Sequence, residues 1–198
     1  MPKKQSIQDS AAAERILETA TELFYQQGYR ATGVNEVIDK SAVAKATFYK
    51  HFPAKDDLGR KYLQNLQAAE IKELGAFIDK AKTPRDRFLA PIRWILPWSR
   101  EHKYRGCGFL NIVAEVPDSK HPLRKEAAGL YNNLSLRVKQ LAEELMASDP
   151  NRYRNLVVEE IAQTYLVIFS GALALSAMYD HNWPIKRAIA LLEQLIDK

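Results

Sequence analysis

The chain has 198 residues, of which 46% are hydrophobic and 27% charged, and its formal net charge is +5. These values are typical of a globular protein with a sizeable core, and they exclude a disordered or fibrous chain. The single cysteine, Cys107, excludes an intramolecular disulfide framework. No apolar run approaches the roughly 20 residues of a membrane span, and the N-terminal stretch has no signal-peptide pattern, so we expect a cytoplasmic protein without a membrane partner.

Helical periodicity dominates the sequence, because apolar residues recur three and four positions apart in every long segment. The segments predicted to form helices lie at about 11–27, 34–40, 44–51, 55–81, 83 onward, within 105–124, 122–147, 151–179 and 184 onward. Pro91 and Pro97 are expected to kink or break the helix that Thr83 caps. Since no strand alternation is found, the predicted fold is all-α with about nine helices.

Three short helices within the first fifty residues are the elements of a helix-turn-helix, with Ser41-Ala42-Val43 as the turn. The positions between Asp39 and Asp56 contain four lysines and no carboxylate. Phe48 would face inward, while the cationic, hydroxyl-bearing outer face of the third helix would meet phosphates and base edges. A solvated basic face is the other interpretation that composition leaves open.

The run from Ile16 to Leu58 resembles the DNA-binding domain of TetR-type (tetracycline-repressor-like) bacterial transcriptional regulators. The resemblance rests on ILETATELFYQQGY, on Thr32 before the second helix, and on VAKATFYKHFPAKDDL, which is similar to the family's recognition helix and its junction with the next helix. It implies a helix-turn-helix DNA-binding domain at 1–52 and an effector-binding and dimerisation domain at 53–198. The DNA-binding residues that it implies are Thr32, Lys45, Ala46, Thr47, Tyr49, Lys50 and Lys55.

Five positions depart from the family's pattern. Ala42 and Ala46 stand where glycines are common, Ala54 where a capping Ser or Asn is frequent, and Ile38 and Ser41 where alanines are frequent. An alanine in a turn that requires positive φ costs on the order of 1 kcal/mol, which the fold can tolerate. Thr32 is expected to cap the second helix and to touch the DNA backbone.

The C-terminal region is predicted to contain the dimer interface, because the helix after residue 151 is apolar on more than one face. Two helices per subunit would form a four-helix bundle across a two-fold axis. The interface residues predicted from this pattern are Ile161, Ile168, Ala172, Leu175, Ile189 and Leu192. A helix buried within its own domain is the alternative.

The central region concentrates aromatic residues with polar tips, which suit a ligand cavity. The predicted effector-pocket residues are Trp94, Trp98, Phe109, Asn111, Tyr131 and Tyr165. Ordinary core packing is the alternative for each of them.

No catalytic or metal-binding pattern is found, because the four histidines have no short-range ligand spacing and the sequence has no phosphate loop or nucleophile motif. We therefore expect no enzyme activity, no metal and no cofactor. The predicted function is a ligand-responsive DNA-binding regulator, a homodimeric repressor that leaves a palindromic operator when a small molecule binds. The alternative is a helical small-molecule-binding or interaction protein that does not bind DNA.

Overall fold

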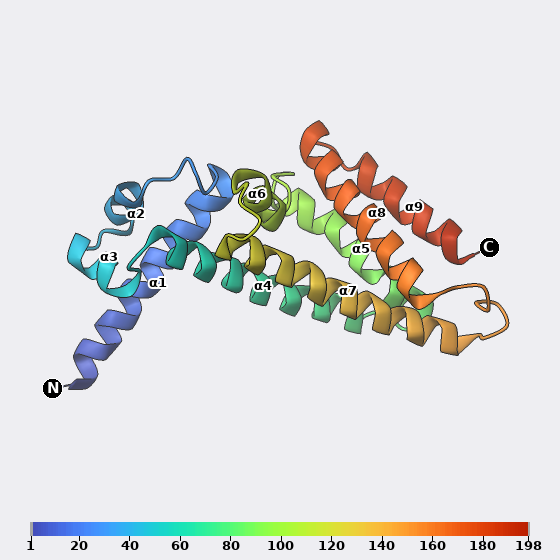
Figure 1. The fold of residues 1–198 in the computed structure, drawn as a ribbon. Helices are drawn as coiled ribbons and strands as arrows, with labels where there is room; N and C mark the ends of the chain where they lie inside the picture. Colours follow the sequence, from blue (N-terminus) through green and yellow to red (C-terminus); the bar gives the residue numbers. More distant parts are fainter. Residues whose placement is uncertain (1, 198) are drawn as a thin grey trace. The chain divides into compact units, whose positions relative to one another are not determined.

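The computed structural model describes residues 2–197, with side chains from residue 10 onward. Within that range the chain is all-α, as predicted, and contains nine helices and no strand (Figure 1). Their bounds are α1 (Pro2–Gln26), α2 (Val34–Ser41), α3 (Lys45–His51), α4 (Lys55–Asp79), α5 (Pro84–Glu101), α6 (Gly108–Glu115), α7 (Pro122–Ser148), α8 (Val158–Tyr179) and α9 (Trp183–Ile196).

Packing divides the chain into two compact units. The first comprises Met1–Gln67 with Gly108–Ala127, and the second comprises Ala68–Cys107 with Ala128–Lys198. Both α4 and α7 contribute one end to each unit. The predicted boundary after residue 52 separates a DNA-binding from an effector-binding part, and this division by function stays a prediction. By packing, α6 and the first half of α4 belong with the helix-turn-helix.

In the first unit, α1 packs against both α2 and α3. Ile16, Phe24 and Phe48 are among the buried residues of this core. Gly28, which follows α1, has a φ of 101°, and a Cβ there would lie 2.8 Å from Oε1 of Glu115 in α6. The Glu115 carboxylate accepts a hydrogen bond from the backbone N–H of Arg30 at 2.7 Å. Gly28 therefore both ends α1 and allows α6 to approach closely.

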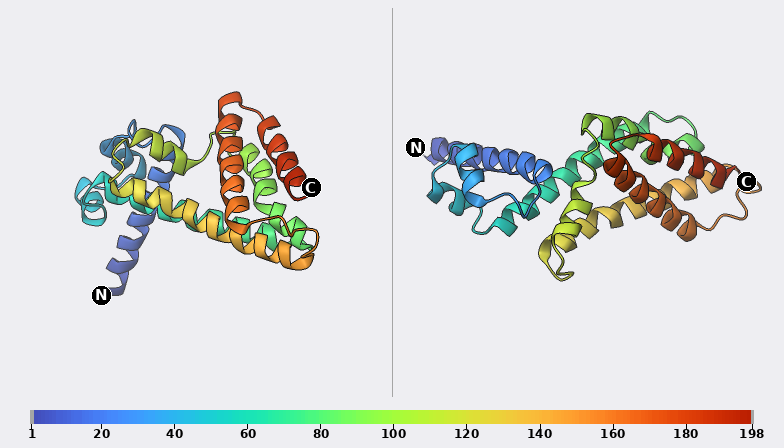
Figure 2. Two further views of the ribbon diagram at one scale, coloured as in Figure 1. Left: turned by 45° about the vertical axis from the view of Figure 1, so that its right-hand side comes forward. Right: turned by 90° about the horizontal axis from the view of Figure 1, so that it is seen from above.

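In the second unit, α5, α8 and α9 pack against one another, and two views agree that α8 and α9 lie side by side (Figures 1 and 2). The Arg93 guanidinium of α5 pairs with Asp86 of the same helix at 2.9 Å and with Glu193 of α9 at 2.8 Å. Tyr165 of α8 is fully buried, and its hydroxyl oxygen accepts a hydrogen bond from the backbone N–H of Ile92 at 2.7 Å. These contacts tie the three helices together.

The start of α5 agrees with its prediction in detail. Thr83 is the N-cap, and its hydroxyl oxygen accepts a hydrogen bond from the backbone N–H of Asp86 at 3.0 Å. The helix then continues through Pro91 and Pro97 to Glu101, so neither proline breaks it. The Tyr165 hydroxyl bonds the N–H of the residue that follows Pro91, which supplies a polar partner beside the proline.

The start of α8 differs from its prediction, since the helix begins at Val158 and not near residue 151. Asp149 directs the preceding turn: its carboxylate accepts the backbone N–H of Arg152, and its carbonyl accepts that of Tyr153, each at 3.1 Å. Side-chain bonding of this kind competes with helix formation. Residues 151–157 are therefore a connection and not part of the helix.

Candidate DNA-binding helix and effector cavity

The recognition helix α3 has one buried face and one exposed face. Phe48 is completely buried, and its ring contacts those of Tyr49 and Phe52 at centroid distances of 5.3 Å and 6.1 Å. Lys45, Ala46, Tyr49 and Lys50 are exposed, and Thr47 is half-buried. The orientation predicted for these side chains is thus the one observed, and the outer face contains two lysines, a phenol and no acid.

The turn between α2 and α3 contains the alanine that departs from the family's pattern. Ala42 caps α2 with φ 51° and ψ 45°, the left-handed conformation that favours glycine. Its backbone N–H donates to the carbonyl of Asp39 at 3.2 Å. Ala44 is the N-cap of α3, so the helix starts one residue later than predicted.

Replacing Ala42 with glycine is expected to stabilise the protein by roughly 0.5–1 kcal/mol, because glycine adopts the left-handed conformation without steric cost. Urea unfolding followed by circular dichroism measures the change. Ala46→Gly is the matched control: it makes the same substitution inside α3 and should destabilise by about 1 kcal/mol. A loss of stability in Ala42→Gly would contradict the assignment of strain to this turn.

Two predicted DNA contacts occupy different environments from those expected. Thr32 is completely buried and its hydroxyl donates to the carbonyl of Gly28 at 2.8 Å, so Gly33, and not Thr32, is the N-cap of α2. A buried side chain cannot reach a phosphate, and Thr32 is removed from the candidate contacts. The Lys55 ammonium lies 4.4 Å from the centroid of the Tyr29 ring, and burial lowers the pKa of Lys55. A phosphate contact by Lys55 stays a prediction.

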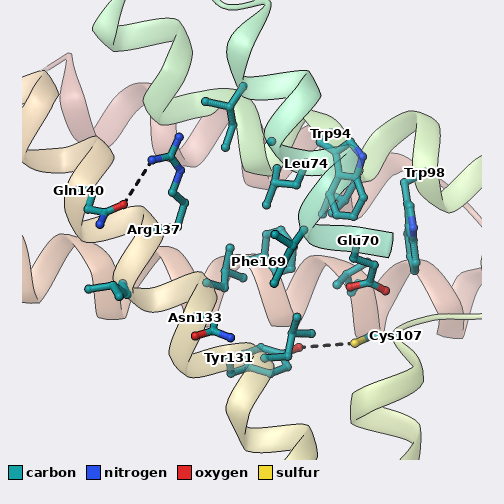
Figure 3. A pocket seen from close by; sticks show the side chains of 18 of the residues that line it. Glu70, Leu74, Trp94, Trp98, Cys107, Tyr131, Asn133, Arg137, Gln140 and Phe169 are labelled. Carbon is teal, nitrogen blue, oxygen red and sulfur yellow. Dashed lines mark hydrogen bonds between the residues drawn. The ribbon is translucent and has the colours of Figure 1, made fainter. Parts of the chain in front are cut away.

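The second unit contains a cavity of about 390 Å³, formed between α4, α5, α7 and α8 (Figure 3). Of the predicted pocket residues, Trp94, Trp98 and Tyr131 line it. Phe109 and Asn111 do not, because both belong to α6 of the first unit. Tyr165 does not either, because it is fully buried in the core.

Sequence reasoning missed several polar residues of the cavity, of which Glu70 of α4 is the most informative. Its Oε1 atom is inaccessible to solvent and has no hydrogen-bond partner among the residues that the structure describes. Burial, with repulsion from Glu73 as a smaller cause, raises the pKa of Glu70 to about 8. The sequence does contain an indication of this site. Glu70 stands four and eight residues before Leu74 and Ile78, so it places an acid on the apolar face of the predicted helix.

The aromatic wall of the cavity is ordered by contacts within the unit. Trp94 and Trp98 pack with ring centroids 5.7 Å apart, and Trp98 stacks on His102 at 4.4 Å. The Tyr131 hydroxyl hydrogen-bonds to the thiol of Cys107 at 4.0 Å, and burial raises the pKa of Tyr131. The cavity therefore combines aromatic rings with few polar groups, as ligand sites commonly do.

An apolar face of α8 remains exposed in the single chain. We define the exposed α8 face by Val167, Ala174, Leu175 and Met178, and Val167 and Met178 are 73% and 72% exposed. By length and composition alone α8 is also apolar enough to cross a membrane, a test that core helices of globular proteins pass as well.

The predicted interface residues divide between this face and the core. Leu175 is exposed, and Ile168 and Ile189 are partly exposed. Ile161, Ala172 and Leu192 are buried within the second unit. Because packing in their own chain occupies these three side chains, the candidate interface shifts to the exposed α8 face.

The sequence of the helix-turn-helix matches a known family. Residues 16–60, which include α2 and α3, match the family model described as "Bacterial regulatory proteins, tetR family". The chain belongs to the TetR family. It is accordingly a helix-turn-helix DNA-binding transcriptional regulator.

Other TetR-family proteins are similar over more of the chain. The transcriptional repressor NemR of Escherichia coli is 30% identical over 128 residues, which cover 62% of this chain and 64% of NemR. The transcriptional regulator LmrA of Bacillus subtilis is 21% identical over 187 residues, covering 93% and 96%. The crystal structure of SCO4454, a TetR-family regulator from Streptomyces coelicolor, superposes with a TM-score of 0.84 at 26% identity and covers 94% and 95% of the two chains.

Proposed function

We propose that this TetR-family regulator is a homodimeric repressor that holds a palindromic operator and leaves it when a small molecule binds in the cavity of the second unit. The observation that carries the DNA-binding part is the division of α3 into a buried Phe48 and an exposed face with Lys45 and Tyr49. Donors on such a face suit phosphate oxygens and base edges. Since chromosomal DNA would be the partner, the protein would act in the cytoplasm.

Dimerisation is part of the proposal, because one seven-residue recognition helix offers few phosphate contacts. Regulators of this family bind operator DNA and small molecules and act as dimers. A second copy of the chain is the proposed occupant of the exposed α8 face. Two copies would then present α3 to half-sites about 34 Å apart, one helical turn of DNA.

Helix α4 is the proposed route from ligand to DNA. It runs without interruption from Lys55 to Asp79, its residues Leu74 and Ile78 line the cavity, and three residues (52–54) join it to α3. A ligand that binds one position of α4 better than another would bias the recognition helix, with a coupling of about 1–3 kcal/mol. Equal ligand affinity for the free and the operator-bound protein would contradict this route.

The double substitution Lys45→Ala with Tyr49→Ala is expected to lower operator affinity roughly 100-fold near 0.1 M salt, because each subunit loses two DNA-facing donors. The slope of log K against log salt should fall by about two, one for each lysine of the dimer. Operator fragments are first selected from genomic DNA by the purified protein, and fluorescence anisotropy at several salt concentrations then measures both quantities.

The control is Lys72→Ala, which removes an exposed lysine of α4 from the second unit and should leave affinity and slope unchanged. Circular dichroism and ultracentrifugation of the double variant verify that its fold and oligomeric state are intact. If the wild-type protein selects no duplex at all, the proposal that two copies of α3 hold a palindromic operator is contradicted. A reporter gene placed after the selected operator tests repression, since transcription should rise when the regulator is deleted.

A further inference from the structure

The wall of the cavity contains a carboxyl group with one unpartnered oxygen. Glu70 points into the space that Trp94, Trp98 and Tyr131 also line (Figure 3). Its Oε1 atom has neither solvent contact nor a hydrogen-bond partner among the described residues. A buried polar group of this kind is costly in the empty protein, so a ligand that supplies the missing partner gains affinity from it.

The groups around Glu70 favour a positive partner. The faces of tryptophan and tyrosine rings carry negative partial charge and attract cations, most strongly where water is excluded. The cavity also offers apolar contacts from Ile71 and Leu74 of α4 and from Phe169 of α8. A charge-bearing group with apolar substituents would satisfy the carboxylate, the rings and the aliphatic wall together.

The cationic group of the protein itself lies elsewhere in the cavity. Arg137 and Gln140 of α7 lie on the other side of the cavity from Glu70 (Figure 3). The Arg137 guanidinium donates a hydrogen bond to the Gln140 amide oxygen at 3.3 Å. The Arg137 guanidinium therefore leaves the Glu70 Oε1 atom without a partner in the described part of the chain. A cation is therefore best placed beside Glu70, away from the Arg137 guanidinium.

We propose that the effector is a lipophilic organic cation, whose positive group binds between the Glu70 carboxylate and the rings of Trp94, Trp98 and Tyr131. The inference rests on the proposed function only in calling this ligand the effector, because the binding site itself is argued from the cavity. The ligand is thus assigned to the class of lipophilic cations, and Glu70 is the residue that distinguishes it from uncharged molecules of the same shape.

Cation binding should be coupled to loss of a proton. At pH 7 the raised pKa keeps the empty-cavity Glu70 largely protonated, whereas a bound cation favours the carboxylate. The other titratable groups facing the cavity are Asp79 of α4, Cys107, and Tyr131 and Arg137 of α7, and Glu73 adds repulsion from outside it. Binding of a permanent cation should therefore release close to one proton at pH 7 and tighten as pH rises towards 9.

The test compares a permanent cation with its uncharged isostere. Benzyltrimethylammonium and neopentylbenzene have the same shape and differ in the charge of one central atom. Titration calorimetry at pH 7, in two buffers of different ionisation enthalpy, measures affinity and proton release for the wild type, for Glu70→Gln and for the control Glu73→Gln. Glu73 is an exposed neighbour on α4 that does not line the cavity.

The wild type should prefer the cation, and Glu70→Gln should weaken cation binding by about tenfold or more and abolish proton release. Neopentylbenzene should bind Glu70→Gln as well as the wild type, which also shows that the variant is folded. Glu73→Gln should keep the preference for the cation and release slightly less of a proton, because it removes the smaller cause of the raised Glu70 pKa. Equal affinity of the wild type for both compounds, absence of cation binding, or unchanged cation binding by Glu70→Gln would overturn the inference.

Operator release is measured separately, so that the two proposals fail independently. Cation binding that depends on Glu70 but leaves the operator complex intact would support this site and contradict its role as the effector site. Release of the operator by neopentylbenzene, with no preference for the cation, would support the effector cavity and overturn the inference about charge.

Discussion

Replacing Val167 with arginine is expected to convert the protein into a monomer that has lost most of its operator affinity. Val167 is 73% exposed at the N-terminal end of the exposed α8 face, and the proposed dimer would bury it against a second copy. Arginine would place an unpaired charge from each subunit in that interface, and an unpaired buried charge costs about 3–5 kcal/mol. This cost lowers the free energy of dimerisation enough to separate the two copies.

Loss of the dimer should also weaken operator binding, because the dimer holds two recognition helices on one operator. A monomer can contact only one half-site, so operator affinity should fall by roughly 100-fold or more, while the fold is retained because the substituted side chain was exposed. Analytical ultracentrifugation and fluorescence anisotropy measure the two effects. Ala147→Arg adds the same charge to an exposed position of α7 and should change neither. A dimer that survives Val167→Arg would place the interface elsewhere.

Replacing Phe48 with alanine is expected to destabilise the helix-turn-helix by about 3–5 kcal/mol, the usual cost of removing a fully buried phenylalanine. Phe48 has no exposed surface, and its ring also contacts that of Phe52, the residue that directly follows α3. The packing of α3 against α1 depends on this side chain, because α3 has only seven residues and contains no other buried one. Amide hydrogen exchange in α1–α3 and urea unfolding measure the loss.

The neighbouring residue provides the control for Phe48. Tyr49→Ala also removes a large ring from α3, but Tyr49 is 43% exposed, so its stability cost should stay near or below 1 kcal/mol. Operator affinity should fall in both variants for different reasons: in Phe48→Ala because α3 is no longer held, and in Tyr49→Ala because a contact is lost. Comparable destabilisation by the two substitutions would contradict the assigned faces of α3.

Local signals predicted those parts of the fold that depend on neighbouring residues. The Thr83 cap with Pro84 and Asp86 located the start of α5 correctly, because capping involves atoms three residues apart. The left-handed conformation at Ala42 could also be anticipated, since a short helix-to-helix turn needs it. The predicted start of α8 was wrong. The apolar pattern continues upstream of Val158, but the turn that the Asp149 side chain stabilises prevents the helix from starting there.

The sequence by itself determined the all-α fold, the helix-turn-helix and the outward face of α3, since each follows from periodicity, capping and the absence of acids within one short stretch. Only the tertiary structure decided which side of α8 is exposed, because a helix that is apolar nearly all round has no preferred face until its neighbours are in place. The cavity was likewise decided by packing: Glu70, Trp94 and Tyr131 lie far apart in the chain, and folding alone brings them to one space.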